Sequence, residues 1–205
     1  MTACRAPGRG PARQMHRVIV WRKDDDGQWR VAREAPVPKS KQARISTSKS
    51  PAAMPKIDLA AIPVRIGAGY PKPFDEACAG RTRQRLGDAG QLQDFSVNLM
   101  TLPPGRWSSQ RHWHSHEDEF VYVLEGELTL VEDGGPVLLR AGDCACFPKG
   151  TGNGHHLRND SSVLAVYLEV GSRQPDDLTT CSDIDLMSSN RDGAFMHKDG
   201  TPYAE

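Results

Sequence analysis

Short apolar runs with period-two alternation dominate the chain from residue 55 onward. Gly, Pro, Asn and Asp separate these runs, as expected for strands joined by turns. The segment Glu-Asp-Gly-Gly at 132–135 is typical of a tight hairpin turn. We predict eight strands, at Phe95–Leu102, Trp107–His116, Phe120–Leu124, Glu127–Val131, Val137–Leu139, Cys144–Phe147, His155–Arg158 and Val163–Val170.

Eight strands at this spacing predict an all-β fold, a double-stranded β-helix of the jelly-roll type. A chain of 205 residues is long enough for one domain of ordinary size with tails. We place the barrel at 93–172, an arm that packs on it at 54–92, and a C-terminal tail at 173–205. The polar stretch that ends at Leu92 is expected to hold one helical turn or an irregular loop, and the tail to pack along the barrel or across a dimer.

The first 53 residues differ in charge from the rest. They carry twelve Lys and Arg against four Asp and Glu, a net charge of +8, which the remaining residues balance with −8. A hairpin pattern spans Val18–Val31, with Asp26-Gly27 as its turn. An isolated hairpin is marginal in water, so we predict a disordered or loosely packed extension over 1–53.

Three histidines stand on alternate residues, at His112, His114 and His116. Side chains two residues apart on a strand share a face, so they can converge on one point. Glu119, at the start of the next predicted strand, can fold back toward the same point. Neutral imidazoles with one carboxylate suit divalent transition metals, so the pattern indicates a metal site.

The spacing of these residues resembles the first cupin motif. His112, His114, Glu119 and Gly126 match it from the first histidine onward, although the spacer after Gly105 is one residue longer than usual.

A later segment resembles the second cupin motif. Gly142, Pro148, Gly150, His155 and Asn159 match it, with a loop two residues longer between Gly150 and His155.

The resemblance to cupins implies a ligand set and a cofactor. It assigns His112, His114, Glu119 and His155 to one divalent transition metal, such as Zn, Mn, Fe or Ni. His116 then becomes a neighbour at the mouth of the site and a candidate catalytic, proton-moving residue. Two alternatives stay open, because His114 with His116 is a rival pair and a register shift would replace His155 by His156.

The cupin fold hosts isomerases, dioxygenases, decarboxylases, lyases and non-enzymatic binders, so it fixes no reaction. The chain resembles small single-domain bacterial cupins, some of which are labelled sugar-phosphate isomerases. We expect a metal-binding protein that binds or transforms a small polar or anionic metabolite by isomerase- or oxygenase-like chemistry. The alternative is a non-catalytic ligand-binding or sensing protein with a structural metal.

Several residues near the motifs are open to more than one interpretation. Trp107, Trp113 and Tyr122 line the cavity or fill the barrel, and Trp113 is expected to face away from the histidines. Cys144 and Cys146 share a face that we expect beside the cavity, as small buried hydrophobes. Of the basic residues close to the motif, Arg111 is expected to form a surface salt bridge.

Hydrophobic segments and cysteines indicate in which compartment the protein works and which partners it has. No stretch approaches the ~20 apolar residues of a membrane span, and no apolar segment follows the basic N-terminus as in a secretory signal. The five cysteines are odd in number and scattered, as reduced thiols are. We expect a cytoplasmic homodimer with a small-molecule ligand, without nucleic-acid or membrane partners.

The origin of the basic extension is a separate question. Nucleic-acid or acidic-surface binding, organelle targeting and a start site upstream of the true one are the alternatives. Asp24, Asp25 and Asp26 oppose a transit peptide, and no recognition-helix pattern is present. We favour Met54 as the true start, since the sequence from there resembles the opening of small bacterial cupins.

Overall fold

An antiparallel strand pair is present in the N-terminal part of the chain. The computed structural model describes residues 17–23, 29–36, 56–191 and 193–203, in two units, Met1–Ala52 and Ala53–Glu205. In the first unit, β1 (Arg17–Lys23) pairs with β2 (Trp29–Pro36), as the hairpin pattern predicts. Three predictions concern residues outside the described ones: the turn at Asp26-Gly27, the disorder of the rest of the extension and the start at Met54.

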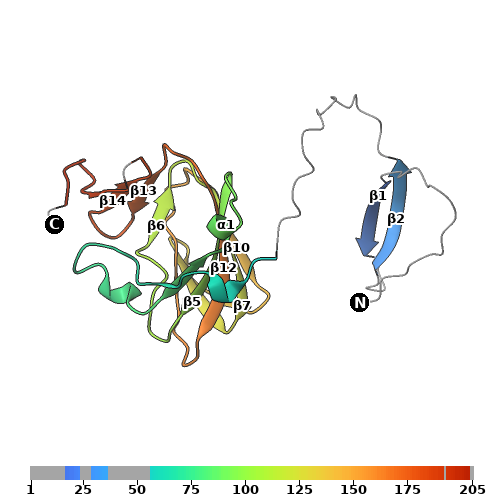
Figure 1. Ribbon diagram of the computed structural model, residues 1–205, viewed down its shortest axis with the longest axis horizontal. Coiled ribbons are helices and arrows are strands. Elements are labelled where there is room, and N and C mark those ends of the chain that lie inside the picture. Colours follow the sequence, from blue (N-terminus) through green and yellow to red (C-terminus); the bar gives the residue numbers. More distant parts are fainter. Residues whose placement is uncertain (1–16, 24–28, 37–55, 192, 204–205) are drawn as a thin grey trace. The chain divides into compact units, whose positions relative to one another are not determined.

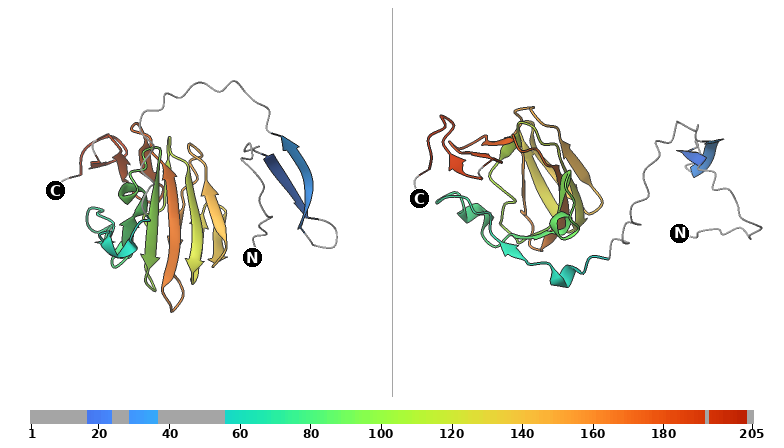
Figure 2. Two further views of the ribbon diagram at one scale, coloured as in Figure 1. Left: turned by 45° about the vertical axis from the view of Figure 1, so that its right-hand side comes forward. Right: turned by 45° about the horizontal axis from the view of Figure 1, so that its top comes forward.

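The second unit is built around a six-stranded sheet. Its order is β10-β7-β12-β5-β4-β3, with every neighbouring pair antiparallel. Figure 2 (left) shows the central strands of this sheet side by side. The strands are β3 (Arg65–Ile66), β4 (Thr82–Arg85), β5 (Phe95–Leu102), β7 (Glu119–Glu125), β10 (Cys144–Phe147) and β12 (Ala165–Ser172).

Two smaller sheets complete the fold. The first has the order β11-β8-β9 and the second β15-β14-β13-β6. The three strands of the first are β8 (Glu127–Glu132), β9 (Gly135–Arg140) and β11 (His156–Arg158). The four strands of the second are β6 (His112–His114), β13 (Leu178–Cys181), β14 (Met187–Ser189) and β15 (Phe195–Met196).

Among the described residues of the second unit, helical structure is confined to short turns. They are η1 (Leu59–Ala61), η2 (Glu76–Cys78) and α1 (Leu86–Ala89). None of the described helices is long and apolar enough to cross a membrane.

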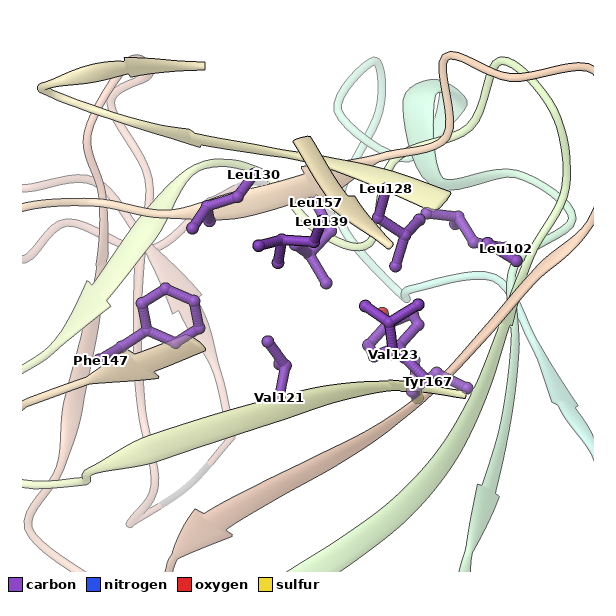
Figure 3. Packing of buried hydrophobic residues seen from close by; sticks show 11 residues of the cluster. Leu102, Val121, Val123, Leu128, Leu130, Leu139, Phe147, Leu157 and Tyr167 are labelled. Atoms are coloured by element: carbon purple, nitrogen blue, oxygen red, sulfur yellow. The ribbon is translucent and has the colours of Figure 1, made fainter. Parts of the chain in front are cut away.

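The hydrophobic core lies between the six-stranded and three-stranded sheets. Figure 3 shows Leu128, Leu130, Leu139 and Leu157 facing Val121, Val123, Phe147 and Tyr167 across it. Buried and exposed positions alternate in β7, where Val121 and Val123 are buried and Tyr122 is exposed. The alternation seen in the sequence is therefore the core pattern of a sandwich, and the jelly-roll prediction is confirmed.

The last glycine of the first motif has a steric role. Gly126 lies between β7 and β8 with a φ of +74°, and a Cβ placed there would approach the carbonyl oxygen of Leu164 to 2.7 Å. Both the positive φ and the close approach favour glycine. This turn brings β8 back over the core.

Several sequence expectations need correction. The strand predicted over Trp107–His116 is shorter, because only His112–His114 form β6 and Trp107 contributes an isolated bridge to Arg158. The polar stretch before Leu92 contains α1 but also the unpredicted strand β4. The tail packs along the barrel, since β13 pairs with β6 (Figure 1).

The cysteine prediction was half right. Cys144 and Cys146 share a face of β10, but that face is exposed, while Ala145 packs against the core and Phe147 is buried. The pair therefore lies on the outside of the sheet, away from the cavity. The spacing of two residues predicts that both cysteines lie on one face of the strand, but it does not predict which face of β10 packs against the core.

Candidate metal centre

Three imidazoles and one carboxylate meet inside the barrel. His112 and His114 belong to β6, Glu119 begins β7, and His155 immediately precedes β11. Two backbone hydrogen bonds, of 3.1 and 2.8 Å, join His112 to His155. Strand pairing thus joins the two motif segments, which are far apart in the sequence.

Glu119 Oε2 is the point on which the imidazoles converge. It lies 2.9 Å from Nε2 of His155, 3.4 Å from Nε2 of His114 and 3.8 Å from Nε2 of His112. All four side chains are 15% exposed or less. The ligand atoms of His112, Glu119 and His155 lie within 4.8 Å of one another, which is close enough for one ion to contact them together.

Hydrogen bonds on the far side of two rings fix their orientation. His112 Nδ1 lies 2.9 Å from the Gln110 carbonyl oxygen, to which it donates, and His114 Nδ1 donates to Asp177 Oδ2 at 2.6 Å. A proton on Nδ1 leaves the lone pair on Nε2, which is the atom that faces Glu119. The two rings therefore turn their Nε2 atoms toward a common point, where each offers a lone pair in its neutral form.

His155 is held by packing instead. Its ring stacks on Phe147, with centroids 3.6 Å apart and an interplanar angle of 1°. Its Nδ1 is buried without a hydrogen-bond partner among the described residues. Stacking and the backbone pairing with His112 fix the position of this ring.

Burial and the close approach of the four side chains change their pKa values. Burial, with help from the neighbouring His155, lowers the pKa of His112 to about 3. Burial also opposes the charged form of His114, but the hydrogen bond to Asp177 and the charge of Glu119 outweigh it and raise its pKa to about 9. Burial disfavours the charged form of Glu119, yet the hydrogen bond from His155 and the other imidazoles hold its pKa well below the usual range.

A cavity of about 190 Å³ opens beside these four residues. Its polar lining includes residues that the sequence analysis did not single out. They are Tyr70, Arg81, Arg83, Ser108, Ser109, Tyr167 and Glu169, with Val121, Phe147 and Leu157 as the apolar part of the wall. The cavity thus places two guanidinium groups and a second carboxyl group next to the histidines.

Glu169 projects into the cavity from the middle of β12. Asn98 Nδ2 donates a hydrogen bond to its Oε1 at 3.0 Å. Burial, followed by the charge of Glu119, raises the pKa of Glu169, while Arg81 and Arg83 act in the opposite direction. Burial thus favours the protonated form of this carboxyl group.

The structure does not bring His116 to the cavity. Its side chain is exposed and is not part of the cavity wall, and its Nδ1 lies 2.8 Å from Ser115 Oγ. Its backbone N–H donates to Asp177 Oδ1 at 2.7 Å. The catalytic role that the sequence suggested for His116 has no support in this position.

His156 also lies outside the cavity wall. It is buried against Trp107, with ring centroids 4.6 Å apart, and its Nδ1 donates to the Ser109 carbonyl oxygen at 3.1 Å. Of the two neighbouring histidines, the structure therefore places His155 beside Glu119.

The aromatic residues and the arginine that the sequence singled out lie outside the cavity wall. Trp107, Trp113 and Tyr122 are not part of the cavity wall. Arg111 pairs with Asp133 at 2.5 Å and with Asp183 at 2.6 Å, so the expected surface salt bridge is present.

Some of the missed residues carry a sequence signal. Arg81, Arg83 and Arg85 alternate, which places three arginines on one face of an extended segment. Glu169 interrupts an apolar run, where an acidic residue is unusual. Asp177 carries no comparable signal, because its importance comes only from its contact with β6.

Comparisons with known proteins agree with the fold and the motifs. The family model described as the cupin domain matches residues 98–171. A crystal structure from Silicibacter pomeroyi, described as a sugar phosphate isomerase from a cupin superfamily, is 47% identical, with a TM-score of 0.69, covering 73% of this chain and 97% of that one. No curated protein matched the chain.

A second solved structure, from Acidithiobacillus ferrooxidans, carries a provisional description as a sugar phosphate isomerase. It is 26% identical with a TM-score of 0.57, and the match covers 64% of this chain and 84% of that one. The motifs, the β-sandwich and these similarities together establish that the chain belongs to the cupin superfamily.

Proposed function

We propose that this chain is a metal-dependent isomerase that moves a proton within a small oxygenated metabolite. The observation that carries the proposal is the convergence of three imidazole Nε2 atoms on Glu119 at the wall of a cavity that also holds Glu169. The first group of residues offers a metal site, and the second carboxyl group offers a proton carrier beside it.

The donor set fits a divalent transition metal. His112, His114, Glu119 and His155 supply three nitrogens and one oxygen, a combination used for Zn, Mn, Fe and Ni. Burial favours the neutral form of His112, which is the form that binds metals. When bound, such an ion supplies a Lewis acid that polarises a carbonyl group.

Glu169 is the proposed acid and base. Isomerisation of a hydroxy-aldehyde to a hydroxy-ketone removes a proton from the carbon next to the carbonyl and returns one to the former carbonyl carbon, while the proton of the neighbouring hydroxyl passes to the former carbonyl oxygen. Glu169 makes its hydrogen bond to Asn98 through Oε1, so Oε2 can face a ligand in the cavity. Burial raises the pKa of this carboxyl group, which makes it a better proton acceptor than an exposed carboxylate and suits it to both proton transfers.

The relatives favour this chemistry over oxygenase chemistry. The Silicibacter pomeroyi protein, at 47% identity over most of its length, is described as a sugar phosphate isomerase. Isomerisation of this kind needs no oxidant, since the electrons stay within the substrate. We therefore take a sugar or sugar phosphate as the substrate class.

Two measurements on one preparation test the proposal. Elemental analysis of untagged protein, purified without chelator, is expected to find about one metal per chain, lost in the variant His112→Ala/His114→Ala. NMR spectra in D₂O are expected to show exchange of the proton next to the carbonyl of aldose and ketose phosphates.

The outcomes separate the candidate functions. Metal together with exchange supports the isomerase. Metal without exchange for any sugar or sugar phosphate overturns it in favour of a non-catalytic ligand-binding cupin, and metal-free, folded protein overturns the metal site itself.

A further inference from the structure

We infer that Arg83 forms an anion subsite that binds the phosphate group of the substrate. This inference deepens the proposed function and rests on it, because the subsite adjoins the same cavity. It assigns a phosphorylated ligand to the site and names the residue that recognises the phosphate.

The sheet register places Arg83 on the core face of the barrel. In neighbouring strands Arg83 pairs with Met100, Met100 with Tyr167, and Tyr167 with Val123. Residues paired across a sheet share a face, and the other three members of this row are buried in the core. A guanidinium group therefore occupies a position where the fold places apolar side chains.

The Arg83 side chain forms no hydrogen bond or ion pair within the described part of the chain, and Glu169 is the carboxylate whose charge acts on it. Its Nε is buried without a hydrogen-bond partner, and no described carboxylate forms an ion pair with it. Burial, followed by the positive charge of Arg85, lowers its pKa. A half-buried guanidinium with an unsatisfied Nε is costly, and a bound anion would reduce that cost.

Other arginines near the site are engaged within the protein. Arg81 donates to the carbonyl oxygens of Gly67 and Ser108. Arg173 pairs with Asp88, which also accepts from Arg85. Arg83 is thus the one guanidinium of this group, among the described residues, whose donors remain open to a ligand.

Arg83 borders two adjoining spaces in the protein. It lines the cavity beside the histidines and also an adjoining polar cleft of about 330 Å³, together with Glu119 and Glu169. A ligand whose carbonyl end lies near Glu119 and Glu169 can therefore extend its other end toward Arg83. Arg81 lines the same cavity, and its positive charge adds to that of Arg83, which favours an anionic group there.

Calorimetric titration of the full chain with inorganic phosphate tests the subsite. Wild-type protein is expected to bind phosphate, and Arg83→Gln to bind it at least tenfold more weakly. Arg83→Lys, which keeps the charge but loses the planar fork, should lie between them. Arg140→Gln, which removes an exposed arginine from β9, is the matched control and should bind like wild type.

Further measurements on the same proteins distinguish a failure of the phosphate subsite from a failure of the proposed isomerase function. Metal content should be unchanged in Arg83→Gln and thermal stability should be equal to or above that of wild type, because an unsatisfied cation is removed while the fold and the metal site persist. Equal phosphate affinity in wild type and Arg83→Gln, or no phosphate binding by wild type, overturns the subsite. Proton exchange by wild type with an unchanged KM for sugar phosphates in Arg83→Gln overturns it as well, while the isomerase proposal survives.

Discussion

His114 donates a hydrogen bond from Nδ1 to Asp177 Oδ2 at 2.6 Å, and Asp177 is fully buried. The same carboxylate accepts from Ser115 Oγ at 3.2 Å and from the backbone N–H of His116 at 2.7 Å. Asp177 precedes β13, the tail strand that pairs with β6. The C-terminal tail thus orients a histidine of the candidate metal centre.

Replacing Asp177 by Asn is therefore expected to weaken metal binding by about 10–100-fold. Asparagine can keep the shape of the contact, but it cannot hold the Nδ1 proton of His114 with a full negative charge. Competition with a chelating dye measures the change in metal affinity.

Asp176→Asn is the control, because it alters an exposed neighbour that pairs with Arg191 and should leave the metal affinity unchanged. If Asp177→Asn binds the metal as tightly as Asp176→Asn does, Asp177 does not position His114.

Removal of the metal should leave a protein whose stability is greatest near pH 6.5. The pKa of His114 is raised from 6.5 to about 9, so its contribution is complete below about pH 6.5 and is lost as the pH rises through 9. The pKa of His112 is lowered from 6.5 to about 3, so the unfolded chain gains a proton first and stability falls from pH 6.5 toward pH 3.

Urea unfolding of chelator-treated protein at pH 5, 6.5 and 9 measures this profile. Asp177→Asn should flatten its alkaline side, because the carboxylate that raises the pKa of His114 is gone. A free energy of unfolding that increases between pH 6.5 and 9 in the wild type would contradict the raised pKa of His114.

Glu169→Gln should abolish proton exchange without removing the metal. The amide keeps the size of the side chain but cannot take up a proton, so the exchange rate should fall by about 10²–10⁴-fold. Glu127→Gln, on β8 and outside the cavity wall, is the control. Exchange at the wild-type rate in Glu169→Gln would assign proton transfer to another group.

Gly126→Ala should destabilise the fold by about 1–3 kcal/mol, since the turn needs a positive φ and a Cβ would approach Leu164. Gly134→Ala lies in the β8–β9 turn, where a Cβ meets nothing within 4 Å, and should cost much less. Chemical denaturation compares the two variants, and similar losses of stability would refute the steric explanation.

The sequence predicted the barrel because alternation of apolar residues directly encodes which face of a strand is buried. It also indicated which histidines gather, since His112 and His114 share a strand face with Glu119 close behind. The choice between His155 and His156 depended on a loop of unusual length. Only the backbone pairing of His155 with His112 fixes which ring faces Glu119.

Arg83, Glu169 and Asp177 could not be assigned in the same way. Glu169 and Asp177 reach the site through pairing between strands distant in the sequence, as when β12 pairs with β7 or β13 with β6. The polar sequence of β4 also lacks the apolar alternation that marks a strand. The homodimer, the cytoplasmic location and the absence of nucleic-acid and membrane partners stay predictions.

The central claim is that one metal ion binds among His112, His114, Glu119 and His155. Anomalous diffraction from crystals of protein purified without chelator, collected on both sides of the absorption edge of the metal found by elemental analysis, tests it most directly. We predict a single anomalous peak at bonding distance, about 2.0–2.2 Å, from the three Nε2 atoms and a Glu119 oxygen. A peak held by His116 or His156, or no peak in metal-supplemented crystals, would contradict the account.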